Sequence, residues 1–332
     1  MIVRYEEVVN VFIEKLMKRG VEEKEAAICA TLMAQNSLDG VYSHGVNRFA
    51  RVIEYIDKGY IDPKARPEKI AAIGSFERWD GKLALGPNNA TKAMDRAIEI
   101  AREQGIGIVA IRNTNHWMRG GSYGWQAADS GMIGICWTNT MPNMPAWGAK
   151  DNRIGNNPFV LAVPRENKEH VVVDTAMSQF SYGKLEMMAL ENKELPVYGG
   201  YDEEGKLSRD PGSIFKTRRV LPIGFWKGSG LSILLDLIAS ILSDGNSVSD
   251  VGTQKAEYGL SQVLIAIDPK CGKDSYNSAL VERIIESVTS SIPAEEGHEV
   301  RYPGQNSIRT RRKNLENGIP VVDSIWERIL SL

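Results

Sequence analysis

The sequence predicts an α/β protein in which a central sheet region lies between largely helical N- and C-terminal parts. Three observations support this prediction. Both ends of the chain have the apolar periodicity of helices, the middle contains short apolar runs typical of strands, and no repeat or low-complexity linker divides the chain. With 332 residues, of which 42% are hydrophobic, the chain has enough apolar material for one or two cores.

The first sixty residues are predicted to form a helical unit. Apolar residues recur at three- and four-residue spacing in residues 5–19 and 22–38, and these segments stop at Gly20 and near Gly40. The same pattern occupies residues 47–58, before Gly59. Each segment therefore has one apolar face, as helices that cover a common core require.

A sheet is predicted in the middle of the chain. A helix in residues 88–104 ends at Gly105 and runs into the apolar segment GIGIVAI, which is typical of a strand covered on both faces. Further strands and helices follow. The predicted strands are residues 132–138, 159–163, 171–174 and 262–267, and the predicted helices between them are residues 185–192 and 230–243.

The C-terminal part is predicted to be helical again, in residues 275–290, 307–316 and 323–332. Helical ends around a central sheet suggest a discontinuous first domain into which the sheet domain is inserted. We therefore predict a largely helical domain of residues 1–112 plus 285–332 and an α/β sheet domain of residues 113–284.

Charge and hydropathy argue against nucleic-acid and membrane partners. The 40 basic and 42 acidic residues give a net charge of −2 and form no basic block. The N-terminal segment MIVRYEEVV lacks the basic patch and apolar run of a signal peptide. The apolar stretch from Leu231 to Leu242 contains Asp236 and is shorter than the roughly 20 residues needed to cross a bilayer. We expect a cytoplasmic protein.

No metal site is expected. Cys29, Cys136 and Cys271 lie far apart and form no CxxC pair, and the four histidines include no HExxH motif. The cysteines are therefore interpreted as buried or incidental thiols.

Glycine-rich segments give no conventional nucleotide-binding motif. None forms GxGxxG after a strand, which disfavours a Rossmann domain. Residues 200–207, GYDEEGKL, have P-loop spacing, but Leu207 replaces the required Ser or Thr and three acids would repel phosphate, so a hairpin turn is predicted. Gly224–Gly230, GFWKGSG, precedes a predicted helix and is either an anion site at the helix start or a turn needed for packing.

The segment VYSHGVNRF places His44 just before a predicted helix and Arg48 four residues later. A 2-keto acid reductase needs a proton for the carbonyl oxygen, which a histidine supplies near neutral pH, and a cation for the carboxylate, which an arginine supplies. A helix N-terminus lowers the pKa of the imidazole, and an anionic substrate raises it again. The alternative is a capping or core histidine beside a surface arginine.

A second cluster, NTNHWMRGGSYGW, follows the GIGIVAI strand and contains His116 and Arg119. Ligands of α/β sheets commonly lie at such strand ends. The glycines at 120 and 121 also allow the chain to turn into the next helix, so a functional and a purely structural interpretation both remain open.

Together these clusters, with GICWTNT, WGAKDNRIGNNP and GFWKGSGLSILLD, resemble the type-2 malate/L-lactate dehydrogenase family over essentially the whole chain. The resemblance implies a nicotinamide cofactor, NADH or possibly NADPH, bound by a mixed-sheet domain unlike Rossmann's. It also implies a homodimer with an active site near the subunit interface and a small 2-keto acid as substrate. His44 would then be the proton donor, and Arg48 and His116 would line the substrate site.

The resemblance also implies a set of cofactor-binding residues in three segments. They are His170, Val171, Val172, Val173, Asp174, Thr175 and Ala176; Trp226 and Lys227; and Gly304, Gln305 and Asn306. The motifs do not distinguish one 2-keto acid from another, nor from a cyclic imino acid. A nucleotide-binding protein without catalysis and a hydratase or isomerase are the alternatives from other classes.

Overall fold

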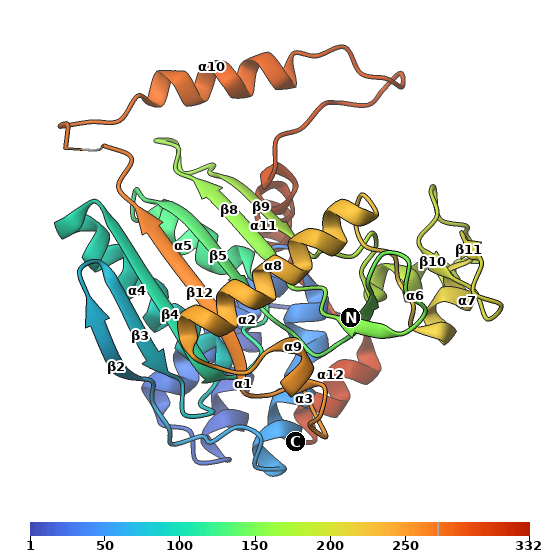
Figure 1. Ribbon diagram of the computed structural model, residues 1–332, viewed down its shortest axis with the longest axis horizontal. Coiled ribbons are helices and arrows are strands. Elements are labelled where there is room, and N and C mark those ends of the chain that lie inside the picture. Colours follow the sequence, from blue (N-terminus) through green and yellow to red (C-terminus); the bar gives the residue numbers. More distant parts are fainter. Residues whose placement is uncertain (271) are drawn as a thin grey trace.

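The computed structural model describes residues 1–270 and 272–332, so Cys271 lies outside the described residues. Its centre is a seven-stranded mixed sheet (Figure 1). Only β3 and β4 run parallel, and all other neighbours are antiparallel. In sheet order the strands are β2 (Glu68–Ile73), β3 (Phe76–Asp80), β4 (Ile106–Thr114), β12 (Leu260–Ile267), β5 (Ile133–Thr138), β8 (Phe159–Val163) and β9 (Val171–Thr175). The predicted mixed α/β class is confirmed.

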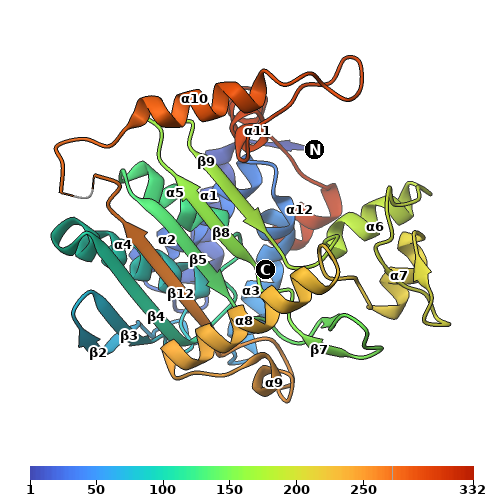
Figure 2. The same ribbon diagram turned by 45° about the horizontal axis from the view of Figure 1, so that its top comes forward.

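Helices cover both faces of this sheet. Helices α4 (Gly86–Gln104) and α5 (Gly121–Asp129) pack on one face, and α8 (Trp226–Ser243) crosses the other (Figure 2). Along β4, Val109 and Ile111 enter the core under α4, whereas Ala110 enters the core on the opposite face. This alternation explains the continuous apolar run in GIGIVAI, because each face of the strand needs its own apolar residues.

The two ends of the chain share one core. Helices α1 (Tyr5–Met17), α2 (Glu23–Leu38) and α3 (Val46–Asp57) pack with α12 (Asp323–Leu330). Strand β1 (Ile2–Val3) pairs with β13 (Ile319–Pro320). Trp326 from the last helix is buried among residues that include Phe12 and Phe49, whose rings stack 3.7 Å apart.

The remaining elements lie around these three cores. They are β6 (Met144–Pro145), β7 (Asn152–Ile154), α6 (Tyr182–Leu190), β10 (Gly200–Tyr201), β11 (Leu207–Ser208), α7 (Pro211–Thr217), α9 (Val248–Val251), α10 (Ser278–Thr289) and α11 (Gln305–Asn317). Strands β10 and β11 pair as a hairpin, so the predicted turn in residues 200–207 is confirmed.

Several boundaries differ from the sequence analysis. The edge strand β2 and its neighbour β3 are absent from the predicted elements. Every residue of β2 is exposed, so it has no apolar pattern. Helix α8 begins at Trp226 rather than at residue 230, after Phe225 in a left-handed conformation. Strand β4 runs through residue 112, and the division of the chain into two domains stays a prediction.

Helix α8 is, among the described helices, long and apolar enough to cross a membrane by length and composition, and a third of that window is buried. Asp236 within it accepts hydrogen bonds from Asn139 and from the backbone of Val248, which tie the helix to the protein. We therefore interpret α8 as a helix that lies on the sheet.

We predict that Trp326→Ala lowers the free energy of unfolding by about 3–5 kcal/mol, because it leaves a cavity in the core shared by both chain ends. The milder Ile329→Val should cost about 0.5–1.5 kcal/mol in urea-induced unfolding followed by circular dichroism. Val322→Ala, at an exposed position beside the same helix, is the control and should change little. Equal small effects for Trp326 and Val322 would contradict the shared core.

Candidate active site

The turn before α3 places His44. Residues Tyr42–His44 form a short 3-10 turn, and α3 begins two residues later, after Gly45. The Ser37 Oγ accepts a hydrogen bond from the first amide of α3 at 2.9 Å, and the Asn36 side chain donates to the carbonyl of His44 at 3.0 Å. A Cβ at position 45 would lie 2.0 Å from the Ser37 Oγ, so this close approach requires glycine.

The turn after β4 places His116. Asn115 anchors the turn by donating hydrogen bonds to the carbonyls of Leu83 and Ala84, at 2.9 and 3.1 Å. The backbone N–H of Met118 donates to the His116 Nδ1 at 3.0 Å. Because Nδ1 accepts this bond, the neutral ring carries its proton on Nε2.

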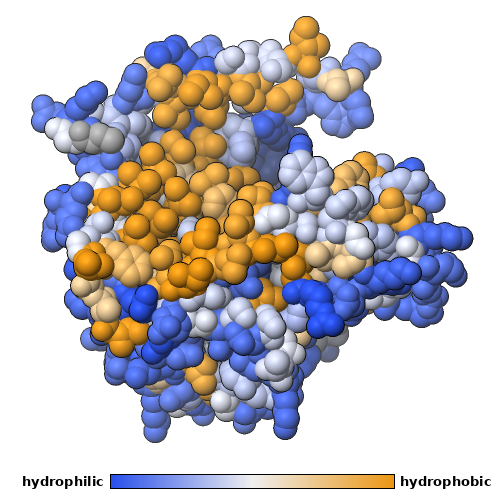
Figure 3. Space-filling model, viewed as in Figure 1, coloured by the Kyte–Doolittle hydropathy of each residue, from blue (hydrophilic) through white to orange (hydrophobic). Residues whose placement is uncertain are grey.

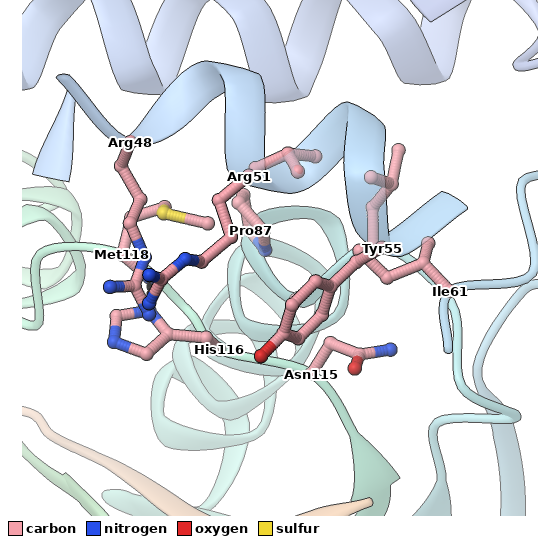
Figure 4. A pocket seen from close by; sticks show the side chains of 11 residues that line it. Arg48, Arg51, Tyr55, Ile61, Pro87, Asn115, His116 and Met118 are labelled. Atoms are coloured by element: carbon pink, nitrogen blue, oxygen red, sulfur yellow. Dashed lines mark hydrogen bonds between the residues drawn. The ribbon is translucent and has the colours of Figure 1, made fainter. Parts of the chain in front are cut away.

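The structure brings His44, Arg48 and His116 together. The two imidazole rings are stacked with their centroids 5.6 Å apart. The Glu257 Oε1 lies 4.0 Å from both the Arg48 Nη2 and the His116 Nε2, and its other oxygen accepts a hydrogen bond from the backbone of Met141. Figure 4 shows the Arg48 side chain extending from α3 towards His116 at one side of a pocket.

Burial and positive charge keep both imidazoles neutral. Desolvation, followed by the charges of Arg48 and Arg119, lowers the pKa of His44 to about 4. Desolvation and the charge of Arg48 also hold the pKa of His116 well below its ordinary value. The pKa of His44 is lowered, as expected, but the main causes are burial and two guanidinium groups rather than a helix N-terminus.

His44 also lines a cleft of about 530 Å³, within the size range of small-molecule and cofactor sites. One wall is β9 with the residue that follows it, and another is the loop that precedes α11. Of the residues implied as cofactor-binding, the cleft is lined by Val172, Val173, Asp174, Ala176 and Gly304.

The other implied cofactor residues do not line this cleft. Val171 and Thr175 belong to β9, and Gln305 and Asn306 begin α11. The His170 ring is fully buried, its Nδ1 accepts from the Arg165 backbone, and its Nε2 lies 3.0 Å from the Asp129 carboxylate. Trp226 and Lys227 are exposed at the start of α8.

A buried ion cluster holds Arg119, which lines the cleft. The Asp39 carboxylate accepts from the Arg119 Nη1 at 2.5 Å and from two nitrogens of Arg311 at 2.7 and 2.9 Å. Arg119 also donates to the Ser307 Oγ at 3.0 Å, and its Nε lies 4.0 Å from the Asp174 carboxylate. Residues from α2, from the loop before α5 and from α11 are thereby joined beside His44.

Comparison with known proteins gives the family. A family model described as malate/L-lactate dehydrogenase matches residues 3–330. The chain belongs to the malate/L-lactate dehydrogenase family. A curated relative from Citrobacter koseri, named 2,3-diketo-L-gulonate reductase, is 50% identical over 332 residues and 99% of each chain. The resemblance noted in the sequence motifs is thus confirmed.

Solved structures of this family agree with the fold. Malate dehydrogenase from Entamoeba histolytica superposes with a TM-score of 0.93 at 25% identity, covering 100% of this chain and 97% of that one. Sulfolactate dehydrogenase from Methanocaldococcus jannaschii gives 0.89 at 29% identity, covering 100% and 98%. The predicted oxidoreductase class is therefore confirmed.

Sequence patterns do not identify three of the residues around this site. Glu257 lies in the loop before β12, more than 200 residues from His44, and no local pattern marks it. Arg119 was noted beside His116 but not assigned to the site. Its position before two glycines and a helix at a strand end was a usable signal, whereas its buried partner Asp39 was not recognisable.

We predict that the ring of His44 titrates near pH 4 in nuclear magnetic resonance spectra of the free enzyme. Since this pKa lies below the ordinary value of about 6.5, protonation favours the unfolded chain. The contribution of His44 to stability is therefore fully present above pH 6.5 and declines as the pH falls through 4. The His44→Asn variant identifies the signal, and a midpoint at 6.5 or above would contradict the assignment.

Proposed function

We propose that the protein reduces the C2 carbonyl of 2,3-diketo-L-gulonate to give 3-dehydro-L-gulonate, with NADH or NADPH as the reductant. The carrying observation is the pair of stacked imidazoles beside Arg48, at the edge of a cleft of cofactor size. The substrate assignment is supported by the name of the Citrobacter koseri relative, which is 50% identical over the full length.

The hydrogen bonds of the two imidazoles support His44 as the proton donor. Protonation of His116 would turn its Nδ1 into a donor that faces the N–H of Met118, so this ring is held neutral. The Nδ1 of His44 lies 3.1 Å from the Ser43 hydroxyl, which accepts from a protonated Nδ1 both before and after the Nε2 gives up its proton, and can donate to an unprotonated Nδ1. His44 is therefore the ring that can gain and lose a proton without losing its partner.

Each side chain has a defined task in this proposal. Arg48 binds the carboxylate of the substrate, and the Nε2–H of His116 donates to the reacting carbonyl oxygen. The negative charge of the bound carboxylate raises the pKa of His44 from its low value in the free enzyme. The protonated His44 then gives its proton to the C2 oxygen, which becomes the hydroxyl of the product.

The cleft beside His44 fits a nicotinamide cofactor, which supplies a hydride to C2 when it is bound. Val172, Val173 and Ala176 offer an apolar wall, and Asp174 and Arg119 offer polar groups. At Gly304, which has a left-handed backbone, an added Cβ would lie 3.3 Å from the backbone nitrogen of Val172 in β9, so the loop lies directly against the strand. Oxidation assays with both cofactors distinguish a preference for NADH from one for NADPH.

The principal test is oxidation of NADH and of NADPH with 2,3-diketo-L-gulonate, pyruvate and oxaloacetate. Loss of the proton donor in His44→Ala should lower kcat by about 10²–10⁴ and leave the dissociation constant of the cofactor within about threefold. His298→Ala, at an exposed histidine, is the control. A His44→Ala enzyme with normal turnover would remove the assignment.

Reduction of a different 2-keto acid is the second candidate. The solved structures of the family include proteins named malate dehydrogenase and sulfolactate dehydrogenase, and each shares the whole fold. Preference for pyruvate or oxaloacetate in the same assay would favour it.

A homodimer is also part of the proposal. Apolar side chains form a wide exposed area over α8, the adjoining sheet face and the side of α10 that faces them (Figure 3). Exposed residues of α8 include Leu231, Leu234, Leu237 and Ile241, and α10 buries none of its residues. An apolar area of this extent is typical of an interface, and Trp226 and Lys227 lie at the start of the same helix.

We predict that the wild-type protein sediments as a dimer and that Leu237→Glu with Ile241→Glu shifts it to monomers, because two buried charges per subunit would oppose association. Met17→Glu, at an exposed apolar position on α1, is the control and should remain dimeric. Sedimentation velocity distinguishes the two states. A monomeric wild type would refute this part of the proposal.

Location in the cytoplasm completes the proposal. Cys29 is a free thiol buried in the core shared by the chain ends, and Cys136 is a free thiol buried in the core under α4 and α5, an arrangement suited to a reducing compartment.

A further inference from the structure

A second arginine lies on the same face of α3 as Arg48. Arg48, Arg51 and Tyr55 follow one another at spacings of three and four residues, which places them on one side of the helix. All three line the pocket that contains His116, and Asn115 lies on the opposite wall (Figure 4). The pocket therefore continues from the reacting groups along α3.

The positive charges that line this pocket are only partly balanced by acidic side chains of the protein. Within residues 1–270 and 272–332, Arg51 makes no ion pair and Arg48 has only the Glu257 carboxylate, 4.0 Å away and beyond hydrogen-bond reach. The substrate carboxylate satisfies Arg48 in the proposed reaction. The guanidinium of Arg51, one turn farther along α3, remains available to donate hydrogen bonds.

The side-chain oxygen of Asn115 is a hydrogen-bond acceptor that receives no hydrogen bond from the protein. The amide nitrogen of Asn115 lies within hydrogen-bond distance of the carbonyls of Tyr60, Leu83 and Ala84, which share its two N–H donors, and these three acceptors fix which end of the amide is the oxygen. The Asn115 Oδ1 is buried and accepts no hydrogen bond. A carboxylate or keto oxygen cannot satisfy it, because neither carries a proton, whereas a hydroxyl group can.

We propose that Arg51, Tyr55 and Asn115 form a subsite that binds the hydroxyl groups of the substrate tail and so selects a sugar acid over a short 2-keto acid. The inference rests on the proposed function, which places the reacting carbonyl between His44 and His116. Hydroxyl groups both donate and accept, and this wall offers donors on Arg51 and Tyr55 and an acceptor on Asn115. The subsite determines specificity, and the proton transfer stays with His44.

The test compares kcat and KM for 2,3-diketo-L-gulonate, pyruvate and oxaloacetate. Arg51→Gln should lower kcat/KM for the sugar acid by about 10- to 100-fold, mainly through KM, because it removes a charged donor from a hydroxyl. Turnover of pyruvate, which has no tail, should change by less than about threefold. Tyr55→Phe removes only the hydroxyl and should give a smaller loss in the same direction. Lys58→Gln, at an exposed position of the helix C-cap, is the control, and thermal melting verifies folding.

The outcomes separate the two proposals. Equal losses on the sugar acid and on pyruvate would overturn the subsite, because Arg51 would then act on the reacting centre. A selective loss on oxaloacetate would also overturn it, in favour of a site for a second carboxylate. A wild type that shows no preference for the sugar acid would overturn it as well. A wild-type enzyme that is inactive on every 2-keto acid would refute the proposed function itself, independently of the subsite.

Discussion

The site depends on the ion pairs that the Asp39 carboxylate makes with Arg119 and Arg311. The carboxylate lies at the end of α2, is almost completely buried, and binds two guanidinium groups that come from positions 80 and 272 residues farther along the chain. A buried guanidinium that loses its ion-pair partner costs several kcal/mol, so Asp39 stabilises the buried Arg119 most strongly and also fixes Arg311. The side of the cleft next to His44 is therefore set by one acid.

Arg119 connects the buried Asp39 ion pairs with His44. Its charge is shared between Asp39 and the more distant Asp174, and it still lowers the pKa of His44. Arg48 adds to the same effect from α3. The protonated imidazole of His44 is consequently a stronger acid than a free imidazolium, and the ring is mostly neutral in the free enzyme. An anionic ligand that neutralises Arg48 raises the pKa of His44 again. Protonation of His44 is thereby coupled to occupation of the neighbouring pocket.

Local patterns predicted much of this fold. Helices such as residues 5–17 and strands such as residues 159–163 follow from apolar periodicity, because each covers a core with its own side chains. The exposed β2 has no such pattern, since it contributes no buried side chain. In the site, His44 and Arg48 lie close together in sequence and could be inferred, whereas Glu257 and Asp39 act through partners that no local spacing reveals.

Closure of the two chain ends also controls the site. Arg311 and the loop at Gly304 both belong to the C-terminal segment, which continues through β13 and α12 into the core of the first three helices. Pairing of β1 with β13 and burial of Trp326 therefore hold this segment against the cleft. Contacts at such sequence separation carry a large loop-closure entropy cost, which the buried side chains of this core offset. Loosening of the C-terminal segment would open the cleft beside His44 and remove a partner of Asp39 at the same time, while leaving the histidine pair on its own local turns.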